Sequence, residues 1–356
     1  AVNAGTYTAA ATGLAGAKAG NYQLPETGLT QSYTINRAAL TIASVAVEGK
    51  TYDGTTDAKV TSVTFSGLQN GEELVSGTDY TVAGVFDEAN IGMRTATVTV
   101  TMKDTAKARN YQLEKTTATA TATITPVQTT LSLTAKDAVY TGSAYDAETK
   151  LTASSNVENP TITYTYYADN NGEKGAKLDG APVNAGTYWV EGYIAASGNN
   201  SAVTSDAVQF QITQAPLTAT AENKSATYGD TAPAYTVRYA GFVNGETASV
   251  VTGLITFDCA YAAGSDAGEY AITPKGATAD NYAITFVEGK LTVGKRTAAL
   301  EWSGYAERTY DGKASSVTAS VTNKIGNDDV TVTVTGGDAV NAGTYTAAAT
   351  GLAGAK

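Results

Sequence analysis

The sequence contains no histidine and only one cysteine, Cys259. Without histidine, the commonest general base, the commonest partner of serine and cysteine nucleophiles and the commonest metal ligand are missing. A single cysteine can form neither an internal disulfide nor a zinc site. Cys259 stands in the strand-like run LITFDCAY, so we expect it to be a small core residue. We therefore predict no enzyme and no cofactor.

Charged residues and long apolar runs are also scarce. Asp, Glu, Lys and Arg make up 16% of the 356 residues, and the net charge is −11. A negative charge disfavours binding to nucleic acid and to anionic membrane surfaces, which both need basic patches. There is no apolar run long enough to span a bilayer, so we expect no membrane insertion in this segment. The 22 tyrosines, against 6 phenylalanines, suit half-buried strands.

One stretch of the sequence occurs twice. Residues 1–18 read AVNAGTYTAAATGLAGAK, and residues 339–356 repeat them letter for letter, 338 positions later. Repetition at a fixed period is typical of repeat architectures, which form stalks and fibres more often than catalysts. We therefore interpret the sequence as one period of a longer array plus a short overlap. On this interpretation AGNY, as at residues 19–22, would follow the second copy, and residues 6–12 and 344–350 should share one strand conformation.

Four landmarks recur in a fixed order along the chain: a Tyr-Gly turn, an Ala-Gly or Gly turn, an Asn-Tyr pair and a closing β-branched strand. The turn tyrosines lie 88, 88 and 82 residues apart, and the remaining 80 residues complete the period. We expect the glycines to occupy turn positions with positive φ. The landmark residues are Tyr52 and Gly54, Tyr140 and Gly142, Tyr228 and Gly229, Tyr310 and Gly312, and the pairs Asn110-Tyr111 and Asn281-Tyr282.

The landmarks divide the chain into modules with short connections. The connections at residues 125–128 and 213–216 contain no Gly/Ser tether, and an apolar strand follows each of them at once. We therefore expect neighbouring modules to abut end to end as a rod. The predicted modules are residues 38–127, 128–214 and 215–295, with the C-terminal half of a split module at residues 1–37 and the N-terminal half of one at residues 296–356.

Alternating sequence patterns predict the secondary structure. The run TATVTVTM at residues 95–102 places aliphatic residues on one face and mostly threonine on the other, which is typical of a sheet with one face on a core. Glycine-rich and Asn/Asp-rich turns about every ten residues indicate sandwiches or small barrels. We predict an all-β tandem array of small immunoglobulin-like β-sandwich modules. Short helices at residues 70–77 and 244–251 would instead make two of the modules β-grasp-like.

Several of these stretches resemble known domain families. KTYDGTT at residues 50–56 and RTYDGKA at residues 308–314 resemble the YDG domain of bacterial surface proteins. Residues 226–253, which begin ATYGDTAPAY, resemble the MBG domain of YGX type. The module 128–214, with VYTGSAYDA and VNAGTYWV, is similar to a more distant relative. The resemblance implies an extracellular repeat region, at the cell surface or in a secreted fibre, and it transfers no catalytic residue because the shared motifs are turns.

A sorting signal is one possible interpretation of residues 24–28. They spell LPETG, the motif that sortases recognise. A working signal also needs an apolar span and a basic tail, whereas the strand-like run LTQSYTINRAALTI follows here. We therefore favour a turn inside a module.

A calcium site is the metal site that the sequence allows. Asp169, Asn171 and Glu173 bring several oxygen atoms together in the run DNNGE. Calcium takes about six to eight oxygen ligands, usually from a longer alternating loop. A solvated hairpin turn is therefore favoured, and we predict no metal.

Covalent cross-links are a further alternative. Lys50 and Lys224 precede Tyr-Gly turns and could form isopeptide bonds with Asn110 and Asn281. Arg308 stands at the matching place near the C-terminus, and arginine cannot form this bond. We therefore favour solvated lysines and turn-capping asparagines, with an intact mass equal to that of the sequence.

Aromatic residues and paired carboxylates complete the candidates. Tyr164, Tyr166, Tyr167 and Trp189 could stack on sugar rings, but alternation places Tyr164 and Tyr166 on one sheet face, which favours packing. The pair Asp328-Asp329 is interpreted as surface charge, because nothing nearby suggests burial.

We predict a structural repeat segment of a bacterial extracellular stalk or fibre. Its partners would be neighbouring modules of the same protein, head to tail. The alternative is an adhesin module that binds a host or environmental glycan or mucin through tyrosine-rich faces. An enzyme such as a two-carboxylate glycosidase is the least favoured function.

Overall fold

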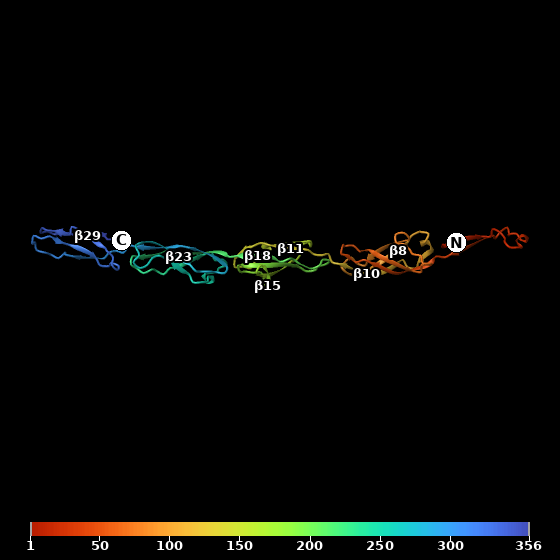
Figure 1. Cartoon of the computed structure of the whole chain (residues 1–356), viewed down its shortest axis with the longest axis horizontal. Helices are drawn as coiled ribbons and strands as arrows, with labels where there is room; N and C mark the ends of the chain where they lie inside the picture. The colour runs from red at the N-terminus through yellow and green to blue at the C-terminus, as the bar shows by residue number, and fades with distance from the viewer. Residues whose placement is uncertain (1, 355–356) are drawn as a thin grey trace. The chain divides into compact units, whose positions relative to one another are not determined.

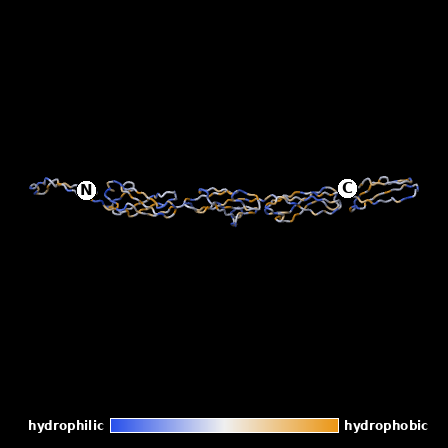
Figure 2. The backbone as a smooth tube through the Cα atoms, turned by 180° about the vertical axis from the view of Figure 1, so that it is seen from behind, coloured by the Kyte–Doolittle hydropathy of each residue, from blue (hydrophilic) through white to orange (hydrophobic). Residues whose placement is uncertain are grey.

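The computed structural model describes residues 2–354, so Ala1, Ala355 and Lys356, at the outer ends of the two 18-residue copies, lie outside the described residues. The described chain is nearly all β (Figure 1), and its helices have four residues or fewer. Hydrophobic and hydrophilic residues are interspersed along the chain (Figure 2), and burial alternates along strands such as residues 92–102, as expected for strands with one buried face. The predicted all-β class is therefore confirmed.

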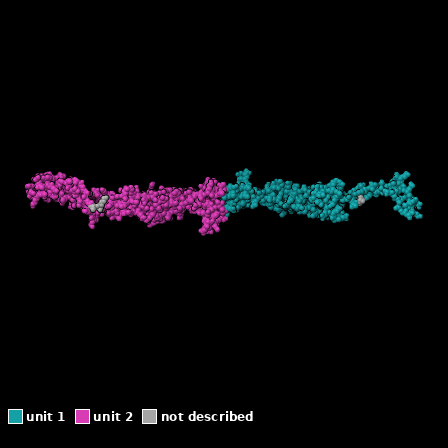
Figure 3. Space-filling view, turned by 45° about the horizontal axis from the view of Figure 1, so that its top comes forward, with its two compact units in different colours: residues 1–133, 153–164, 191–206 teal, residues 134–152, 165–190, 207–356 magenta. Residues whose placement is uncertain are grey.

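The chain divides into two compact units, which Figure 3 distinguishes by colour and which are described separately. Unit 1 comprises residues 1–133, 153–164 and 191–206, and unit 2 comprises residues 134–152, 165–190 and 207–356. The predicted module 128–214 contributes residues to both units. The module boundaries therefore stay predictions.

In unit 1, residues 38–125 form two sheets that pack face to face. The buried cluster of Tyr80, Val98 and Val100 in one sheet packs against Ile42 and Val63 of the other, so the core lies between the sheets. The smaller sheet has the order β6 (Val60–Ser66), β3 (Ala38–Val47), β9 (Tyr111–Leu113), and the larger has the order β4 (Lys50–Thr51), β10 (Thr117–Thr125), β8 (Gly92–Met102), β7 (Tyr80–Phe86), β5 (Asp57–Ala58), with η2 (Ala108–Asn110) before β9.

The module 128–214 has a small and a large sheet. Tyr145, Tyr166 and Phe210 form an aromatic core, in which the rings of Tyr145 and Phe210 are 4.0 Å apart. Its elements are β11 (Leu131–Ala135) paired with β13 (Leu151–Ser155), the path β12 (Ala138–Val139), β18 (Val208–Thr213), β16 (Gly186–Ile194), β14 (Thr163–Asn170), β15 (Glu173–Lys177), the short β17 (Val203–Thr204) beside β16, and α1 (Ala147–Lys150).

In unit 2, residues 215–294 again form two sheets with a core. Ile272 and Leu291 are 0% exposed, and Cys259 packs partly buried against their cluster, as predicted. The sheets have the orders β21 (Val237–Ala240), β19 (Ala215–Ala221), β24 (Tyr282–Val287), and β20 (Lys224–Thr227), β25 (Gly289–Gly294), β23 (Gly268–Lys275), β22 (Thr256–Asp258), with η3 (Ala248–Val250) between β21 and β22.

The β-grasp alternative is wrong, because the short helices do not form. Residues 70–77 contain a turn at Asn70-Gly71 and no helix, and residues 244–251 contain a turn at Asn244-Gly245 and the single 3₁₀ turn η3. Asn70 and Asn244 have φ values of 53° and 51°, and the glycines that follow them also have positive φ. Left-handed residues end a right-handed helix, so these sites are turns.

The two terminal regions differ from the modules between them, since no described residue of 2–37 or of 296–354 is buried. Region 2–37 contains one strand pair and region 296–354 contains three, and each pair is a separate two-stranded sheet. The pairs are β1 (Gly5–Ala10) with β2 (Thr30–Ile35), β26 (Leu300–Ser303) with β28 (Thr318–Val321), β27 (Ser315–Ser316) with β30 (Asp338–Ala339), and β29 (Thr331–Thr335) with β31 (Ala348–Ala353); η1 (Ala19–Asn21) lies between β1 and β2.

The two 18-residue copies have different conformations, so our expectation for residues 6–12 and 344–350 is wrong. The first copy forms strand β1 from its fifth residue, whereas the second forms strand β31 from its tenth. By the criterion of identical conformation, the split-module interpretation gains no support. It stays a prediction.

Strand β8 gives the physical reason for this difference. Its first part pairs with β10, with Gly92 opposite Ile124, and its last part pairs with β7. The pair β1–β2 has the same register as the first pairing, with Gly5 opposite Ile35, and β31 pairs with β29 as the end of β8 pairs with β7. Each copy has one neighbouring strand, and it is extended where that strand supplies hydrogen bonds.

Candidate functional site

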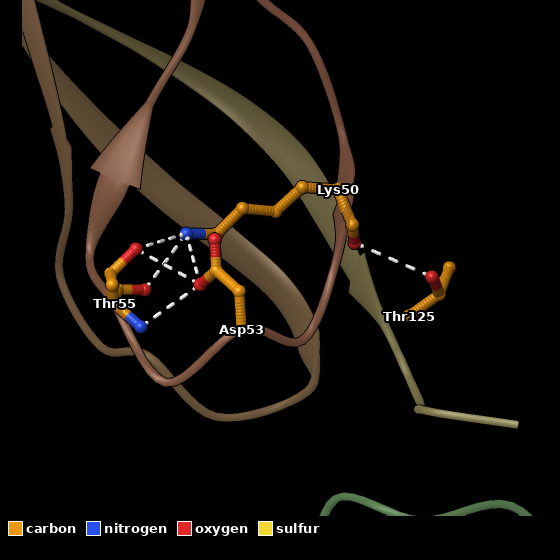
Figure 4. Close-up of polar contacts among 4 residues, drawn as sticks. All are labelled: Lys50, Asp53, Thr55 and Thr125. Carbon is orange, nitrogen blue, oxygen red and sulfur yellow. Dashed lines mark hydrogen bonds and ion pairs between the residues drawn. The ribbon is translucent and has the colours of Figure 1, made fainter.

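The landmark residues meet at the places where one module contacts the next. The first landmark, the Tyr-Gly turn, is held by its own side chains (Figure 4). Asp53 accepts hydrogen bonds from Lys50 Nζ at 2.8 Å and from Thr55 N at 2.9 Å, and these bonds lower the pKa of Asp53 to about 2. Gly54 has φ 79°, which explains the glycine. Thr125 Oγ1, at the end of β10, lies 3.3 Å from the Lys50 carbonyl oxygen and donates to it.

The Tyr-Gly turn is attached to the closing strand in the same way in three modules. The backbone N–H of the landmark tyrosine donates to a carbonyl of the last residue of that strand. This bond brings the turn to the end of the module where the chain leaves it. The bonds are Tyr52 N to Thr125 O (2.9 Å), Tyr140 N to Thr213 O (2.8 Å) and Tyr228 N to Gly294 O (2.9 Å).

The second landmark, the Ala-Gly turn, is closed by the tyrosine that follows it. The hydroxyl donates to the carbonyl four residues earlier, and in the module 38–127 an arginine takes the place of the tyrosine. This contact explains the spacing Asn/Asp-Ala-Gly-x-Tyr. The bonds are Tyr7 OH to Asn3 O, Tyr188 OH to Asn184 O, Tyr270 OH to Asp266 O, Tyr345 OH to Asn341 O and Arg94 Nε to Asn90 O, at 2.6–3.0 Å.

The third landmark, the asparagine of the Asn-Tyr pair, bonds to the Ala-Gly turn of the preceding module. Asn281 Oδ1 accepts from Ala185 N at 2.8 Å, and Asn281 Nδ2 donates to Asn184 Oδ1 at 3.1 Å. Because both ends of the amide are used, the contact fixes the direction as well as the distance between the two groups. We call this pair of bonds the amide clamp.

The amide clamp recurs twice in unit 1. Asn110 Oδ1 accepts from Ala4 N at 2.8 Å, and Asn110 Nδ2 donates to Asn3 Oδ1 at 3.1 Å. Asn199 bonds likewise to the turn of the module before it, with Ile91 N as donor at 3.1 Å and Asn90 Oδ1 as acceptor at 3.3 Å. The asparagines thus cap a neighbouring module's turn and not their own.

A carboxylate joins the tyrosines of adjacent modules. Glu246 Oε1 accepts from Tyr140 OH at 2.7 Å, and Glu246 Oε2 accepts from Tyr282 OH. The two rings meet edge to face with centroids 5.5 Å apart, and both tyrosines are at most 4% exposed. The hydrogen bonds from Tyr282 and Tyr140 lower the pKa of Glu246, and the bond to Glu246 together with burial raises the pKa of Tyr140 to about 12.

In two further contacts a tyrosine hydroxyl donates to a carboxylate. Tyr228 OH donates to Asp328 Oδ1 at 2.9 Å, which raises the pKa of Tyr228. Tyr111 OH donates to Glu72 Oε2 at 2.7 Å within the module 38–127. Asp328 was interpreted as surface charge, and that interpretation is corrected here, because its carboxylate accepts from the tyrosine of the preceding module.

The turn glycines leave room for the neighbouring module. A Cβ atom on Gly142 would lie 2.6 Å from the Asn244 Cβ, and one on Gly229 would lie 2.4 Å from the Ile325 Cγ1. Asn244 Nδ2 also donates to the Gly142 carbonyl at 3.0 Å. Glycine is therefore required at position 142 for two reasons, the φ of 74° and the close approach.

The candidate calcium ligands Asp169, Asn171 and Glu173 belong to a β-hairpin, as favoured from the sequence. Asn171 and Gly172 have φ values of 55° and 88°, as in a two-residue turn, and they connect β14 to β15. The Asp169 carboxylate accepts from Gly172 N, Trp189 Nε1 and Gln209 Nε2 at 2.9–3.1 Å. Among the residues that the structure describes, no group of three or more His, Cys, Asp or Glu could hold a metal ion.

The isopeptide candidates are engaged in other contacts. Lys50 Nζ donates to Asp53 and Thr55, and Lys224 Nζ forms an ion pair with Glu222 at 3.2 Å. The amides of Asn110 and Asn281 form the amide clamps described above. Residues 24–28, the LPETG run, form a mostly exposed loop before β2.

The junction carboxylates were not singled out by the sequence analysis. Asn70-Gly71-Glu72 and Asn244-Gly245-Glu246 share the letters NGE, which we interpreted as possible helix starts. The recurrence of NGE at the same place in two modules was the signal that could have marked these glutamates. Their partners come from other turns more than 35 residues away, so the spacing could not show the contact.

Family models match two parts of this chain. Residues 36–120 match the YDG domain, and residues 217–292 match the MBG domain of YGX type. The resemblances of residues 50–56 and of residues 226–253 are therefore confirmed, and that of residues 308–314 stays a prediction. The two matches indicate a repeat region of a surface protein, and neither domain type is catalytic.

Two solved structures of Drosophila N-cadherin show a distant likeness. The EC1-4 structure is 9% identical, with 75% of this chain and 80% of that chain covered and a TM-score of 0.19. The EC1-3 structure is 11% identical, with 72% and 99% covered and a TM-score of 0.22. These scores are too low to support an argument. A comparison with curated proteins found no match. No helix among residues 2–354 is both long and apolar enough to cross a membrane.

Proposed function

We propose that this chain is a structural repeat segment of a bacterial extracellular stalk or fibre, in which each module sets the direction of the next, and that it is not an enzyme. The observation that supports this proposal is the amide clamp, which recurs with the same atoms and the same donor directions at Asn110, Asn199 and Asn281. A site for a foreign ligand has no reason to recur at three successive junctions. A contact that transmits load must recur.

The connection between modules is itself anchored at the junction before β19. Ala215 is 2% exposed, and its N–H donates to the Asn281 carbonyl at 3.0 Å. Gln214 Nε2 donates to the Asp280 carbonyl at 2.9 Å. The connecting residues are thus held against the module that follows, so this connection is not a free tether.

Small-angle X-ray scattering tests the proposal. We expect a particle with the cross-section of one module and a length of several modules. The double variant Asn199→Ala, Asn281→Ala should broaden the distribution of distances, because two clamps are lost. Asn21→Ala is the matched control, since this asparagine has no side-chain partner among residues 2–354. A compact globule, or a double variant indistinguishable from the wild type, would contradict the proposal.

An adhesin is the second candidate, and one observation favours it. Tyr188 packs on Phe210 in the core, so Trp189, next along β16, points to the opposite face of the sheet. Its indole donates to Asp169 at 2.9 Å and is thereby fixed in orientation. Tyr166 is only 6% exposed and is not available for stacking. Reproducible hits on a glycan array that are lost in Trp189→Ala would support glycan binding.

A further inference from the structure

The C-terminal region presents a junction surface that has no partner among residues 2–354. Tyr310 is 64% exposed, and a Cβ on Gly312 would meet nothing within 4 Å. Asn341 and Ala342 form the Ala-Gly turn that an amide clamp would hold, but within residues 2–354 no asparagine binds them. These four residues correspond in order to Tyr140, Gly142, Asn184 and Ala185, which bind the next module.

The module 38–127 presents the complementary surface. Glu72 accepts from Tyr111 through Oε2, and its Oε1 has no donor in the described chain, whereas both oxygens of Glu246 accept from tyrosines. Asn70 has φ 53°, close to the 51° of Asn244, whose amide donates to the neighbouring turn. The amide of Asn70 has no such acceptor among residues 2–354.

Asn110, the third residue of this surface, already binds an Asn-Ala-Gly turn of the same sequence as the turn at Asn341-Ala342. It clamps Asn3 and Ala4, which belong to the first copy of the 18-residue segment. Asn341 and Ala342 occupy the same positions of the second copy, and the residues on either side of them are identical in the two copies. The structure therefore shows that Asn110 binds this sequence, although from the copy at residues 1–18.

We propose that the surface formed by Asn70, Glu72 and Asn110 binds residues 296–354 of a second copy of this chain. Tyr310 donates to Glu72 Oε1, Asn70 donates to the Gly312 carbonyl, and Asn110 clamps Asn341 and Ala342. The arrangement is the one observed between the modules 128–214 and 215–295. The inference rests on the proposed function, since it names the partner of a head-to-tail structural segment.

The second copy must displace the first strand of the β1–β2 pair from Asn110. The exchange replaces two hydrogen bonds with the same two bonds, and the Tyr310 and Asn70 contacts are additional. The β1–β2 pair has no buried residue, so its own stability is small. The contact joins two different surfaces of the protein, so it is heterologous. Each bound copy still has one free surface, and repeated binding therefore builds chains of copies.

The two identical segments allow a matched test by sedimentation velocity over a range of protein concentrations. Proline lacks the N–H that the clamp requires. Ala342→Pro should weaken self-association, because it removes the donor of the incoming copy. Ala4→Pro should strengthen self-association, because it removes the same donor from the competing copy. A wild type that is monomeric at every concentration, or two variants that shift in the same direction, would overturn the proposal.

Tyr310→Phe gives an independent measure. It removes the hydroxyl that donates to a carboxylate, and we expect self-association to weaken about tenfold or more. Tyr305→Phe is the control, because Tyr305 is 72% exposed in the same region and has no counterpart at the observed junctions. Equal effects of the two substitutions would contradict the assignment of Tyr310. The scattering experiment on the Asn199 and Asn281 clamps is performed in dilute solution, so failure of self-association leaves the proposed function testable.

Discussion

The complete modules and the terminal regions have the same kind of sequence but different burial. Strand β25 has the alternating pattern KLTV, in which Leu291 is 0% exposed and Val293 is 3% exposed. Strand β29 has the alternating pattern TVTVT, yet none of its residues is buried. The difference is how completely the strands are covered: a second sheet buries β25, whereas β29, which has β28 beside it, keeps its valines only partly buried. An alternating pattern thus selects a strand and a face, but the covering sheet decides whether that face becomes a core.

Core truncation should separate the two regions most strongly. Leu291→Ala removes methyl groups from a fully buried site, and we expect the free energy of unfolding of the module 215–295 to fall by about 2–5 kcal/mol. Leu352→Ala, in β31, changes a side chain that is 56% exposed and should have an effect within about 0.5 kcal/mol. Denaturant unfolding followed by hydrogen exchange measures both. A large effect at Leu352 would show that the C-terminal region has a core.

Two turn glycines separate the effect of a contact between modules from the effect of the turn conformation alone. Gly142 and Gly312 have φ values of 74° and 76°, so alanine costs about 1–2 kcal/mol of backbone strain at either position. Gly142→Ala also places a Cβ against Asn244 and should destabilise more than Gly312→Ala. The two tryptophans, Trp189 and Trp302, report the two regions by fluorescence during thermal unfolding. Equal effects would contradict the contact at Gly142.

The amide clamp should contribute less than the core. Asn281→Ala removes two hydrogen bonds and leaves Ala185 N–H without its acceptor, for a loss of about 1–2 kcal/mol. Asn21→Ala, at the corresponding position of the terminal region, should be neutral. The rate of hydrogen exchange at the Ala185 N–H measures the loss of this hydrogen bond directly. Unchanged protection at Ala185 would contradict the clamp.

The smallest expected effect is a pH dependence of the tyrosine–carboxylate contact. The pKa of Glu246 is lowered in the folded state, so its contribution is present above the ordinary carboxyl pKa and is lost as the pH falls through the folded value. The pKa of Tyr140 is raised to about 12, so its contribution is complete below about pH 10 and is lost as the pH rises through about 12. The Tm difference between wild type and Tyr140→Phe should therefore be largest between about pH 5 and 10. A difference that is constant across this range and beyond it would contradict the contact.

The sequence alone determined the strand-rich class, the landmark turns and the two domain families. These features depend on local chemistry, because alternation sets the buried face of a strand and positive φ selects glycine at a turn. The glycines at positions 54, 142, 229 and 312 were predicted as left-handed residues, and each has φ between 74° and 88°. The hairpin at Asn171-Gly172 was favoured because the run DNNGE is too short for a typical calcium loop. The alternative with short helices was wrong because the two left-handed residues at each NGE outweigh the helix propensity of the residues after them.

Only the tertiary structure decided what the landmarks do. Asn281 and Asn184 are 97 residues apart, and Tyr140 and Glu246 are 106 residues apart. Contacts at such separations depend on how one module is oriented relative to the next. No local sequence pattern encodes that orientation. The same limit applies to the two 18-residue copies. Their identical sequences form different strands, because a strand takes its hydrogen bonds from a neighbour, and the two copies have different neighbours.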